Sequence, residues 1–313
     1  MWFIRDGLGI LLGLLTWALL LFADWVIVRH VLVSWFWTSK PRVEALPLTD
    51  AGLALFAVYQ SILGLSWFSH LQAMTTDPGT IRQRIAPDGF PNSRVCRLCE
   101  DRWKPPRAHH CKTCRQCIFR MDHHCPWINN CVGLGNQKLF ILFLGYTTLS
   151  AAVTFVILLV SAAFWLWSQK SWSDAPHPSS VALVCTGVLA VVCLLAIIFI
   201  GDFFQEQIES IATNCTLVET YQRTHGKRTT FMDHFRTIFG THWSVWLWPF
   251  PTAPPPDYTE LAIPDSDTAG WPGMTIDDPD SLGIEGESTE APITTMAFHA
   301  AAEGINGTTM PRQ

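Results

Sequence analysis

The sequence predicts an all-α integral membrane protein with four transmembrane helices and a cytosolic cysteine-rich, zinc-binding loop domain between helices two and three. Hydrophobic residues make up 49% of the 313 residues and charged residues only 15%, against about 25% charged residues in a typical soluble domain. Four long stretches are almost free of charge, and seven of the ten cysteines lie in the polar segment between two of them. This composition excludes a soluble enzyme, a collagen and a chain that is disordered throughout.

Each uncharged stretch is long enough to cross about 30 Å of hydrocarbon, which takes roughly 20 helical residues. The stretches cover residues 8–28, 51–73, 139–167 and 179–201. The third exceeds the minimum, so it tilts or extends beyond the bilayer. A cleaved signal peptide is the alternative for the first stretch. Its apolar run is longer than the usual run of about 7–15 residues, however, and no small-residue cleavage site follows.

Lysine and arginine are distributed unequally about these spans. Seventeen lie at the N-terminus, between spans two and three, or after span four, and four lie in the other two loops. Because basic loops stay in the cytosol, both termini and the central segment are predicted to be cytosolic. Tryptophans mark the opposite interface: Trp35, Trp37, Trp165, Trp167 and Trp172.

Five regions follow from this organisation. They are residues 1–73 (helices one and two with a short luminal loop), 74–138 (the zinc-binding catalytic domain), 139–204 (helices three and four), 205–250 (a cytosolic juxtamembrane region) and 251–313 (an acidic tail). The tail has eleven acidic residues and one base, which predicts disorder. The aromatic cluster at residues 243–250 is expected either in the headgroup layer or against the central loop.

The central segment combines cysteines and histidines at metal-binding spacings. In chain order they are Cys96, Cys99, His109, His110, Cys111, Cys114, Cys117, His123, His124, Cys125 and Cys131. The cytosol reduces disulfides, so such a cluster indicates metal binding or catalysis. Zinc takes four tetrahedral ligands, and a C-x2-C pair supplies two of them from one tight turn.

Counting ligands leaves one cysteine over. Two zinc ions, each bound by three cysteines and one histidine, would use six cysteines and two histidines. The segment offers seven cysteines and four histidines. Cys125, beside Asp122 and His123, is the natural candidate for the remainder. A cysteine next to an imidazole can be a thiolate at neutral pH, so the pattern predicts nucleophilic catalysis on a zinc-ordered loop.

Other metal modules match parts of the pattern. A purely structural zinc module would leave Cys125 idle. An iron–sulfur site would give the histidines no role, and the gap before Cys125 is seven residues rather than the three of a ferredoxin run. A thioredoxin-like motif lacks its surrounding βαβ pattern. Nucleic acid is not expected as a partner, because the segment is tethered between spans and interrupted by prolines.

The position of the segment favours a lipid substrate. The third span begins only eight residues after Cys131, which keeps Cys125 near the bilayer surface. A helix bundle there can bury a fatty chain, at about 0.8 kcal/mol per CH2 group, while its thioester stays in reach. Basic residues would either attract an anionic nucleotide headgroup or serve only as solvated charges that set the topology: Arg82, Arg84, Arg94, Arg97, Lys112, Arg115 and Arg120.

These motifs resemble a known family. The stretch from Asp122 to Trp127 reads DHHCPW and the stretch from Asn129 to Gly133 reads NNCVG, and both closely resemble the DHHC-type protein S-acyltransferases (palmitoyltransferases). Asp77-Pro78-Gly79 and the four spans extend the resemblance over residues 1–250. The opening residues 1–7 are similar to a Golgi-resident subgroup, which implies a Golgi membrane, with the endoplasmic reticulum or another endomembrane as the alternative.

The resemblance implies a two-step protein S-palmitoyltransferase. The Cys125 thiolate would attack the thioester of an acyl-CoA such as palmitoyl-CoA, and a cytosolic cysteine of a membrane-associated protein would then take the chain from the acyl-enzyme. His123 would be the base and Asp122 would orient it. The implied partners are acyl-CoA, such protein substrates and the lipid bilayer. The alternative function is a catalytically silent, zinc-stabilised membrane adaptor.

The resemblance also implies two structural Zn²⁺ ions with crossed ligands. Cys96, Cys99, His110 and Cys117 would hold one ion, and Cys111, Cys114, His124 and Cys131 would hold the other. A sequential pairing satisfies the same count, so spacing alone leaves both arrangements open.

Two positions bear on activity and specificity. The family usually shows Thr-Thr-x-Glu after span four, where this chain has Leu217 as the second residue. If that threonine holds the catalytic aspartate, the leucine side chain cannot replace it. Ser150 aligns with a position in span three whose bulk limits the acyl chain. Its small side chain predicts that chains longer than palmitoyl are accepted.

Overall fold

The computed structural model describes residues 4–32, 50–82, 84–85, 95–171, 179–222 and 224–252. All of them belong to one compact unit, Met1–Trp271, and a second unit, Pro272–Gln313, lies outside the described residues. The predicted disorder of the tail from residue 253 onwards, and the interfacial tryptophans at 35, 37 and 172, likewise fall outside these ranges.

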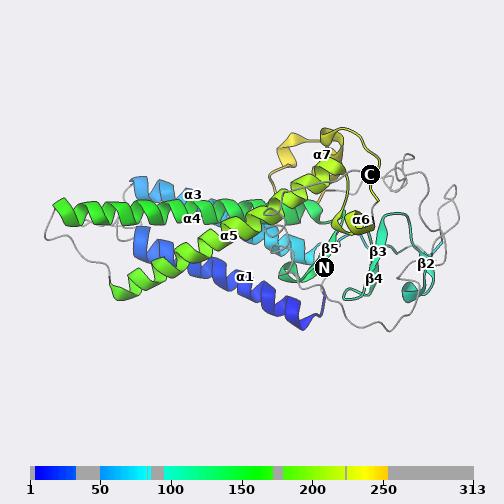
Figure 1. The fold of residues 1–313 in the computed structure, drawn as a ribbon, viewed down its shortest axis with the longest axis horizontal. Coiled ribbons are helices and arrows are strands. Elements are labelled where there is room, and N and C mark those ends of the chain that lie inside the picture. The colour runs from blue at the N-terminus through cyan, green and yellow to red at the C-terminus, as the bar shows by residue number, and fades with distance from the viewer. Residues whose placement is uncertain are drawn as a thin grey trace, which may run out of the picture. The chain divides into compact units, whose positions relative to one another are not determined.

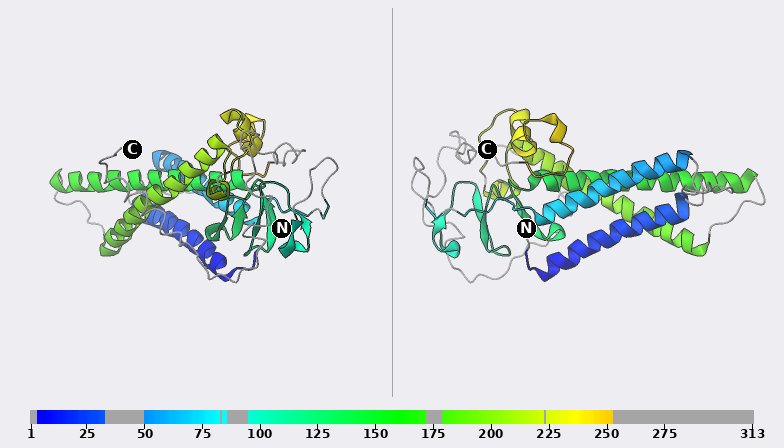
Figure 2. Two further views of the ribbon diagram at one scale, coloured as in Figure 1. Left: turned by 45° about the vertical axis from the view of Figure 1, so that its right-hand side comes forward. Right: turned by 180° about the vertical axis from the view of Figure 1, so that it is seen from behind.

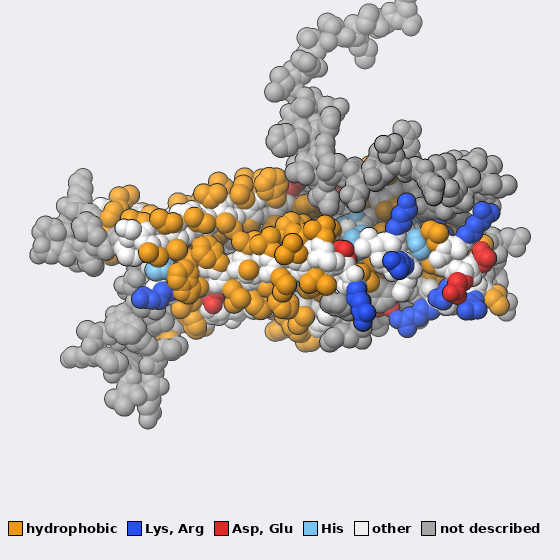
Figure 3. Space-filling view, turned by 90° about the horizontal axis from the view of Figure 1, so that it is seen from below, with side chains coloured by type: hydrophobic (Ala, Val, Ile, Leu, Met, Phe, Trp, Pro, Cys, Tyr) orange, Lys and Arg blue, Asp and Glu red, His pale blue; other side chains and the backbone are white. Residues whose placement is uncertain are grey.

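Four long apolar helices correspond to the four predicted spans (Figure 1). They are α1 (Gly7–Val26), continued by a π-helix over Ile27–Leu32, then α3 (Asp50–Thr75), α4 (Gln137–Ser171) and α5 (Ser180–Thr213). Each is long and apolar enough to cross a membrane. Figure 3 shows hydrophobic side chains over the helices, whereas Lys and Arg side chains gather over the cysteine-rich segment. The predicted fold class is therefore confirmed.

The helix ends follow ordinary capping chemistry. The side chain of Asp6 accepts a hydrogen bond from the Gly9 amide (2.9 Å), and that of Ser179 accepts one from Ala182 (3.2 Å). Such side chains satisfy amides that have no partner inside a helix. Asn214 ends α5 with a φ of 49°, a left-handed conformation that asparagine tolerates.

Helix α5 is longer than the apolar stretch that predicted it. The stretch ends at Gly201, but the helix continues to Thr213 through Asp202, Glu206 and other polar residues. Backbone hydrogen bonds hold a helix whatever its side chains, so the loss of apolar residues marks the end of a span and not the end of a helix. The polar extension brings Gln207 to the cysteine-rich segment.

Inside the membrane bundle, α4 packs between α3 and α5. Large side chains from all of these helices are fully or nearly fully buried in one core: Leu20, Ile27, Tyr59, Leu63, Leu158 and Leu189. The bundle provides the rigid frame to which the cysteine-rich segment is attached.

The cysteine-rich segment forms three short antiparallel hairpins at one end of the helices (Figure 2). Strand β1 (Val95–Cys96) pairs with β2 (Arg102–Trp103), β3 (Ala108–Cys111) with β4 (Gln116–Phe119), and β5 (His123–Cys125) with β6 (Asn130–Val132). Two-stranded hairpins of this length are marginal alone in water, so the segment depends on further cross-links.

The chain after α5 folds back onto the bundle. It forms α6 (Leu217–Gln222) and α7 (Phe231–Phe239), whose Ile238 packs against Ile141 of α4. Lys138 Nζ on α4 donates to the carbonyl oxygens of Val245 (2.7 Å) and Phe250 (3.2 Å). The described contacts of the aromatic cluster are therefore with the membrane bundle, an environment that neither alternative named, and Trp243 remains 78% exposed.

Candidate active site

Two asparagines fasten the β5–β6 hairpin to the end of α3. Asn130 Nδ2 donates to the carbonyl oxygens of Ala73 (3.1 Å) and Thr76 (2.9 Å), and Asn136 Nδ2 donates to that of Ala73 (3.2 Å). The last carbonyls of a helix have no partner within the helix. These side chains satisfy them and hold the hairpin at the end of the membrane bundle.

A close backbone approach supports the same junction. A Cβ on Gly133 would lie 2.5 Å from the Pro78 carbonyl oxygen, and a Cβ on Gly135 would lie 2.3 Å from that of Asp77. Only glycine fits at such distances. The Asp77-Pro78-Gly79 turn after α3 and the glycines after β6 are thus two halves of one packing contact.

Strand alternation separates the two histidines of DHHC. Successive side chains in a strand point to opposite faces, and every second one shares a face. In β5, His124 Nδ1 lies 3.4 Å from Cys114 Sγ. His123 instead hydrogen-bonds with Asp122 and with Cys125. The strand therefore directs one histidine to a cysteine cluster and leaves the other beside the remaining cysteine.

Asp122, His123 and Cys125 form a hydrogen-bonded group. His123 Nδ1 donates to Asp122 Oδ2 over 2.8 Å, and Asp122 is 1% exposed. Burial by itself lowers the pKa of His123, but its hydrogen bonds with Asp122 and Cys125 outweigh that effect and raise the pKa to about 10. A charged imidazole is therefore held beside the Cys125 sulfur.

Asp122 is held by more than His123. Gln207 Nε2 on α5 donates to Asp122 Oδ2 over 2.8 Å, and the backbone amide of Leu217 donates to Oδ1, also over 2.8 Å. Burial alone would raise the pKa of Asp122, but these donors and His123 lower it below its usual value. The leucine side chain cannot donate, as the sequence predicts, but the main chain at this position does.

Cys125 lies between the histidine and the bundle. It is 6% exposed and packs in a cluster with Ile128, Phe140 and Phe143. The Phe140 ring also meets the His123 ring edge to face, with centroids 5.4 Å apart. The sulfur therefore has the polar group on one side and apolar α4 side chains on the other, which suits a thioester with a fatty chain.

The other six cysteines of the segment group with two histidines into two clusters that could hold metal ions. One cluster is Cys96, Cys99, His110 and Cys117, and the other is Cys111, Cys114, His124 and Cys131. The ligand atoms of each cluster lie within 4.8 Å of one another. Cys99 Sγ, for example, is 3.2 Å from His110 Nδ1 and 3.8 Å from Cys117 Sγ. Zinc–ligand bonds of about 2.0–2.3 Å in a tetrahedron require ligand separations close to these.

Hairpin register explains why the clusters are crossed. His110 lies opposite Cys117 in the β3–β4 pair, and His124 lies opposite Cys131 in the β5–β6 pair. Neighbouring residues of β3 point to opposite faces, so His110 turns to one cluster and Cys111 to the other. A sequential pairing would need both on one face, and the structure does not bring those residues together.

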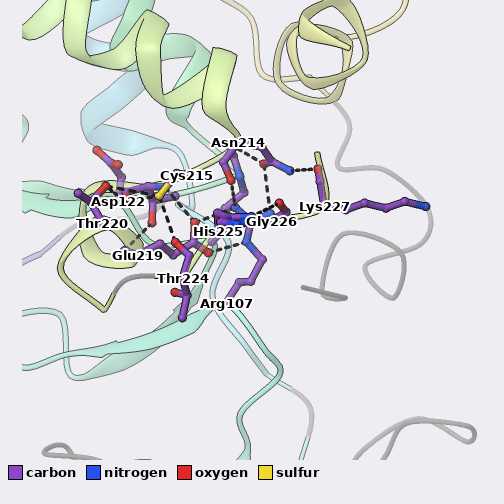
Figure 4. Close-up of polar contacts among 12 residues, drawn as sticks. Arg107, Asp122, Asn214, Cys215, Glu219, Thr220, Thr224, His225, Gly226 and Lys227 are labelled. Carbon is purple, nitrogen blue, oxygen red and sulfur yellow. Dashed lines mark hydrogen bonds and ion pairs between the residues drawn. The ribbon is translucent and has the colours of Figure 1, made fainter. Parts of the chain in front are cut away.

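A buried ion pair connects the β3 loop to α6 (Figure 4). Arg107 binds both carboxylate oxygens of Glu219, with its Nη2 2.8 Å from Oε2, and it also donates to the Asn214 carbonyl oxygen (3.1 Å). Burial alone would raise the pKa of Glu219, but Arg107 lowers it below the usual value. This pair fixes α6, and hence the Leu217 amide, against the hairpins.

Arg120 and Cys215 lie close to this ion pair. Arg120 is 2% exposed and donates to Gln137 and to Asn214 Oδ1, so it is neither available to a nucleotide headgroup nor a solvated charge, the two roles that the sequence left open. Cys215 donates to the Thr224 carbonyl oxygen (3.2 Å), and burial raises the pKa of its thiol. It is a structural thiol in this corner.

The remaining predicted positions are placed as follows. Arg82 pairs with Asp77 over 2.8 Å and Arg84 pairs with Glu100 over 3.5 Å, all at the surface, while Arg94 lies outside the described residues. Ser150 is 5% exposed on α4. One turn earlier, Thr147 shares a hydrogen bond of 2.7 Å with Ser66 of α3, so this face of α4 points into the bundle.

Sequence reasoning missed Gln207 and Arg107. Both are polar residues outside the DHHC stretch, and neither lies in a motif with a chemical signature of its own. The one available signal was the continuation of a polar, helix-forming sequence beyond the fourth span, which carries Gln207 back to Asp122.

Comparisons with known proteins agree with this geometry. The family model described as DHHC palmitoyltransferase matches residues 89–224. Palmitoyltransferase ZDHHC3 of Rattus norvegicus is 35% identical over 269 residues, covering 80% of this chain and 84% of that protein. Palmitoyltransferase ZDHHC7 of Mus musculus is 32% identical over 265 residues, covering 80% of each. Probable protein S-acyltransferase 12 of Arabidopsis thaliana is 30% identical over 241 residues, covering 70% of this chain and 80% of that protein.

Proposed function

The chain belongs to the DHHC palmitoyltransferase family and is a multi-pass membrane protein S-palmitoyltransferase, and from that premise we propose that Cys125 is its nucleophile. The observation that carries the proposal is the hydrogen-bonded group of Asp122, His123 and Cys125, whose sulfur belongs to neither cysteine cluster. None of the comparisons favours a silent adaptor.

In the mechanism that follows from this geometry, acyl transfer takes two steps. The Cys125 sulfur attacks the carbonyl carbon of acyl-CoA, the bond from that carbon to the CoA sulfur breaks, and His123 gives a proton to the departing thiolate. His123 then takes the proton of a substrate cysteine, whose sulfur attacks the acyl-enzyme and releases Cys125. Asp122 holds the imidazole in place throughout, in the manner of the third member of a catalytic triad.

We also propose that the two clusters each hold a structural Zn²⁺ ion. Three cysteines and one histidine fill the four positions of a tetrahedral zinc, which leaves none open for a reactant. The ions would supply the cross-links that the short hairpins lack. The division into regions at residues 74, 139, 205 and 251, with residues 74–138 as the catalytic domain, is part of this proposal.

We also propose the donor, the acceptors and the membrane location of the protein. Palmitoyl-CoA is the proposed donor, and cytosolic cysteines of membrane-associated proteins are the proposed acceptors, because Cys125 lies at the end of the membrane bundle. The positive-inside distribution of Lys and Arg supports two cytosolic termini. The opening residues 1–7, similar to a Golgi-resident subgroup, support a Golgi membrane.

Acyl-enzyme formation tests the nucleophile. Full-length protein in detergent is incubated with labelled palmitoyl-CoA, and the label is then challenged with neutral hydroxylamine, which cleaves thioesters. We expect hydroxylamine-labile label on wild type and on the control Cys215→Ser, and none on Cys125→Ser. Equal labelling of Cys125→Ser would refute the assignment, and an unlabelled, folded wild type would argue for the adaptor.

We further propose that Ser150 lines the acyl-chain pocket and permits chains longer than palmitoyl. Its buried position on the inner face of α4 supports this role. Ser150→Phe should lower the rate with C18 acyl-CoA more than the rate with C16 acyl-CoA, because a large ring shortens the available space. An unchanged C18-to-C16 ratio would contradict the assignment.

A further inference from the structure

A histidine within the membrane bundle connects two helices to the catalytic loop. His70 lies near the end of α3 and is fully buried. The indole nitrogen of Trp17 on α1 lies 2.8 Å from His70 Nδ1, and His70 Nε2 lies 3.0 Å from the carbonyl oxygen of Trp127. Trp127 is two residues after Cys125, so one side chain links α1, α3 and the loop that carries the nucleophile.

Hydrogen-bond chemistry determines the state of this imidazole. An indole N–H only donates, so His70 Nδ1 must be the acceptor. A carbonyl oxygen only accepts, so His70 Nε2 must carry the hydrogen and donate to Trp127. Both ring nitrogens are satisfied in one neutral tautomer. A buried neutral histidine with two such partners has a single orientation, unlike a histidine that merely fills space.

Aromatic contacts hold the ring and its partner in place. The Trp17 ring stacks on Trp67 with centroids 5.5 Å apart, and the His70 ring lies 4.6 Å from that of Phe143. Phe143 packs in the same cluster as Cys125. The imidazole therefore contacts the active site at two places, the Trp127 carbonyl oxygen of the loop and the Phe143 ring that packs with Cys125.

Other contacts hold the residues next to Trp127, where Ile128 is fully buried. Pro126 begins the short 3-10 turn Pro126–Ile128 and has no amide hydrogen to donate. On its far side, Asn129 Nδ2 donates to the Ile4 carbonyl oxygen at the start of α1 (2.8 Å). In Figure 1 the start of α1 and the end of α3 both lie at the end of the bundle that carries the hairpins.

We propose that His70 is a positioning residue for acyl transfer, which sets the Cys125 sulfur at the end of the bundle by binding the Trp127 carbonyl. The inference deepens the proposed function and rests on Cys125 as nucleophile. His70 does not touch the reacting atoms. It acts through the main chain of the loop, and Trp17 acts through His70 by selecting its tautomer.

The test compares four variants in single-turnover acylation of Cys125 by palmitoyl-CoA. His70→Phe keeps the ring shape but removes both hydrogen bonds. Because a small displacement of a reacting group can cost about 100-fold in rate, we expect a 10- to 100-fold lower rate at saturating palmitoyl-CoA, with less than a twofold change in the half-saturating concentration. His70→Gln can still accept and donate, and should recover to within about threefold of wild type.

Two tryptophan variants complete the series. Trp17→Phe removes only the donor to His70 Nδ1 and should fall between wild type and His70→Phe. Trp25→Phe, also on α1 but half-exposed beside His30, is the matched control and should behave as wild type. Metal content and melting temperature are measured for each variant, so that a folding defect is separated from a positioning defect.

The outcomes are distinct. A wild-type rate in His70→Phe overturns the proposal. So does a slow His70→Phe that His70→Gln fails to rescue, if metal content or melting temperature falls in parallel, because the role is then structural. A failure of wild type itself to acylate on Cys125 would refute the proposed function instead, before any His70 variant is compared.

Discussion

At the scale of single residues, the arrangement around Asp122 shows how a departure from a family pattern can be accommodated. A carboxylate buried beside a histidine needs donors for both oxygens. Here one comes from the Leu217 main chain and another from Gln207. A main-chain donor is independent of side-chain identity, so the change at Leu217 leaves this hydrogen bond in place.

Gln207 should therefore affect the rate. Gln207→Leu removes one donor to Asp122, and loss of a hydrogen bond to a buried charge costs about 1.5–3 kcal/mol, which corresponds to roughly 10- to 100-fold. We expect slower acylation of Cys125 with a half-saturating palmitoyl-CoA concentration close to that of wild type. The exposed Gln205→Leu on the same helix is the control, and equal rates for the two variants would exclude a role for Gln207.

At the scale of elements, the hairpins decide how cysteines are shared. The β3–β4 and β5–β6 hairpins each place a histidine opposite a cysteine of its own cluster, and Cys111 at the end of β3 and Cys114 in the turn that follows belong to the other cluster. Because the strands are too short to be stable alone, we infer that hairpins and metal ions stabilise one another.

Metal stoichiometry separates the crossed arrangement from the sequential one. Wild type should contain about two zinc ions per chain, as should Cys125→Ser. In the crossed arrangement, Cys96→Ser combined with Cys117→Ser damages one site and should retain about one zinc. Cys114→Ser combined with Cys117→Ser damages both and should retain none. Elemental analysis of the purified proteins gives the counts, and the opposite pattern would support sequential pairing.

The Arg107–Glu219 pair predicts a dependence of stability on pH. The folded-state pKa of Glu219 is lowered, so its contribution is present above the unfolded-state pKa of about 4.3 and is lost as pH falls through the folded-state value. Breaking a buried pair costs about 3–5 kcal/mol, so Glu219→Gln should melt at a lower temperature than wild type at pH 7.

Melting temperatures of the two proteins between pH 7 and about pH 3, which extends below the unfolded-state pKa, check this expectation. The difference between wild type and Glu219→Gln should shrink at the acidic end, whereas metal loss in acid affects both proteins alike. The exposed Glu209→Gln on α5 serves as the control and should follow wild type. A constant difference across the range would mean that Glu219 does not contribute through its charge.

At the scale of the whole molecule, four apolar helices and a basic cysteine-rich end define a membrane orientation. Epitope tags at either terminus should be accessible to antibody after the plasma membrane alone is permeabilised. A tag inserted between residues 33 and 49 should need full permeabilisation, because basic segments remain cytosolic. Accessibility of the inserted tag under the mild condition would reverse the predicted topology.

The sequence by itself determined the features that depend on composition and local pattern. Uncharged stretches located the four helices to within a few residues at most ends, because a span must be apolar along its length. Residue types at metal-ligand spacing identified the cysteine-rich domain, and its motifs identified the family. Polar residues cannot be interpreted in this way, and so the extension of α5 to Thr213 was not predicted.

Only the tertiary structure decided which groups meet. The crossing of the two clusters depends on strand faces and register, which spacing along the chain does not contain. The partners of Asp122 come from α5 and α6, 85 and 95 residues away in sequence, and the partners of His70 come from α1 and the catalytic loop. Main-chain donors and acceptors have no sequence signature, because every residue but proline carries both. Their placement follows from the fold alone.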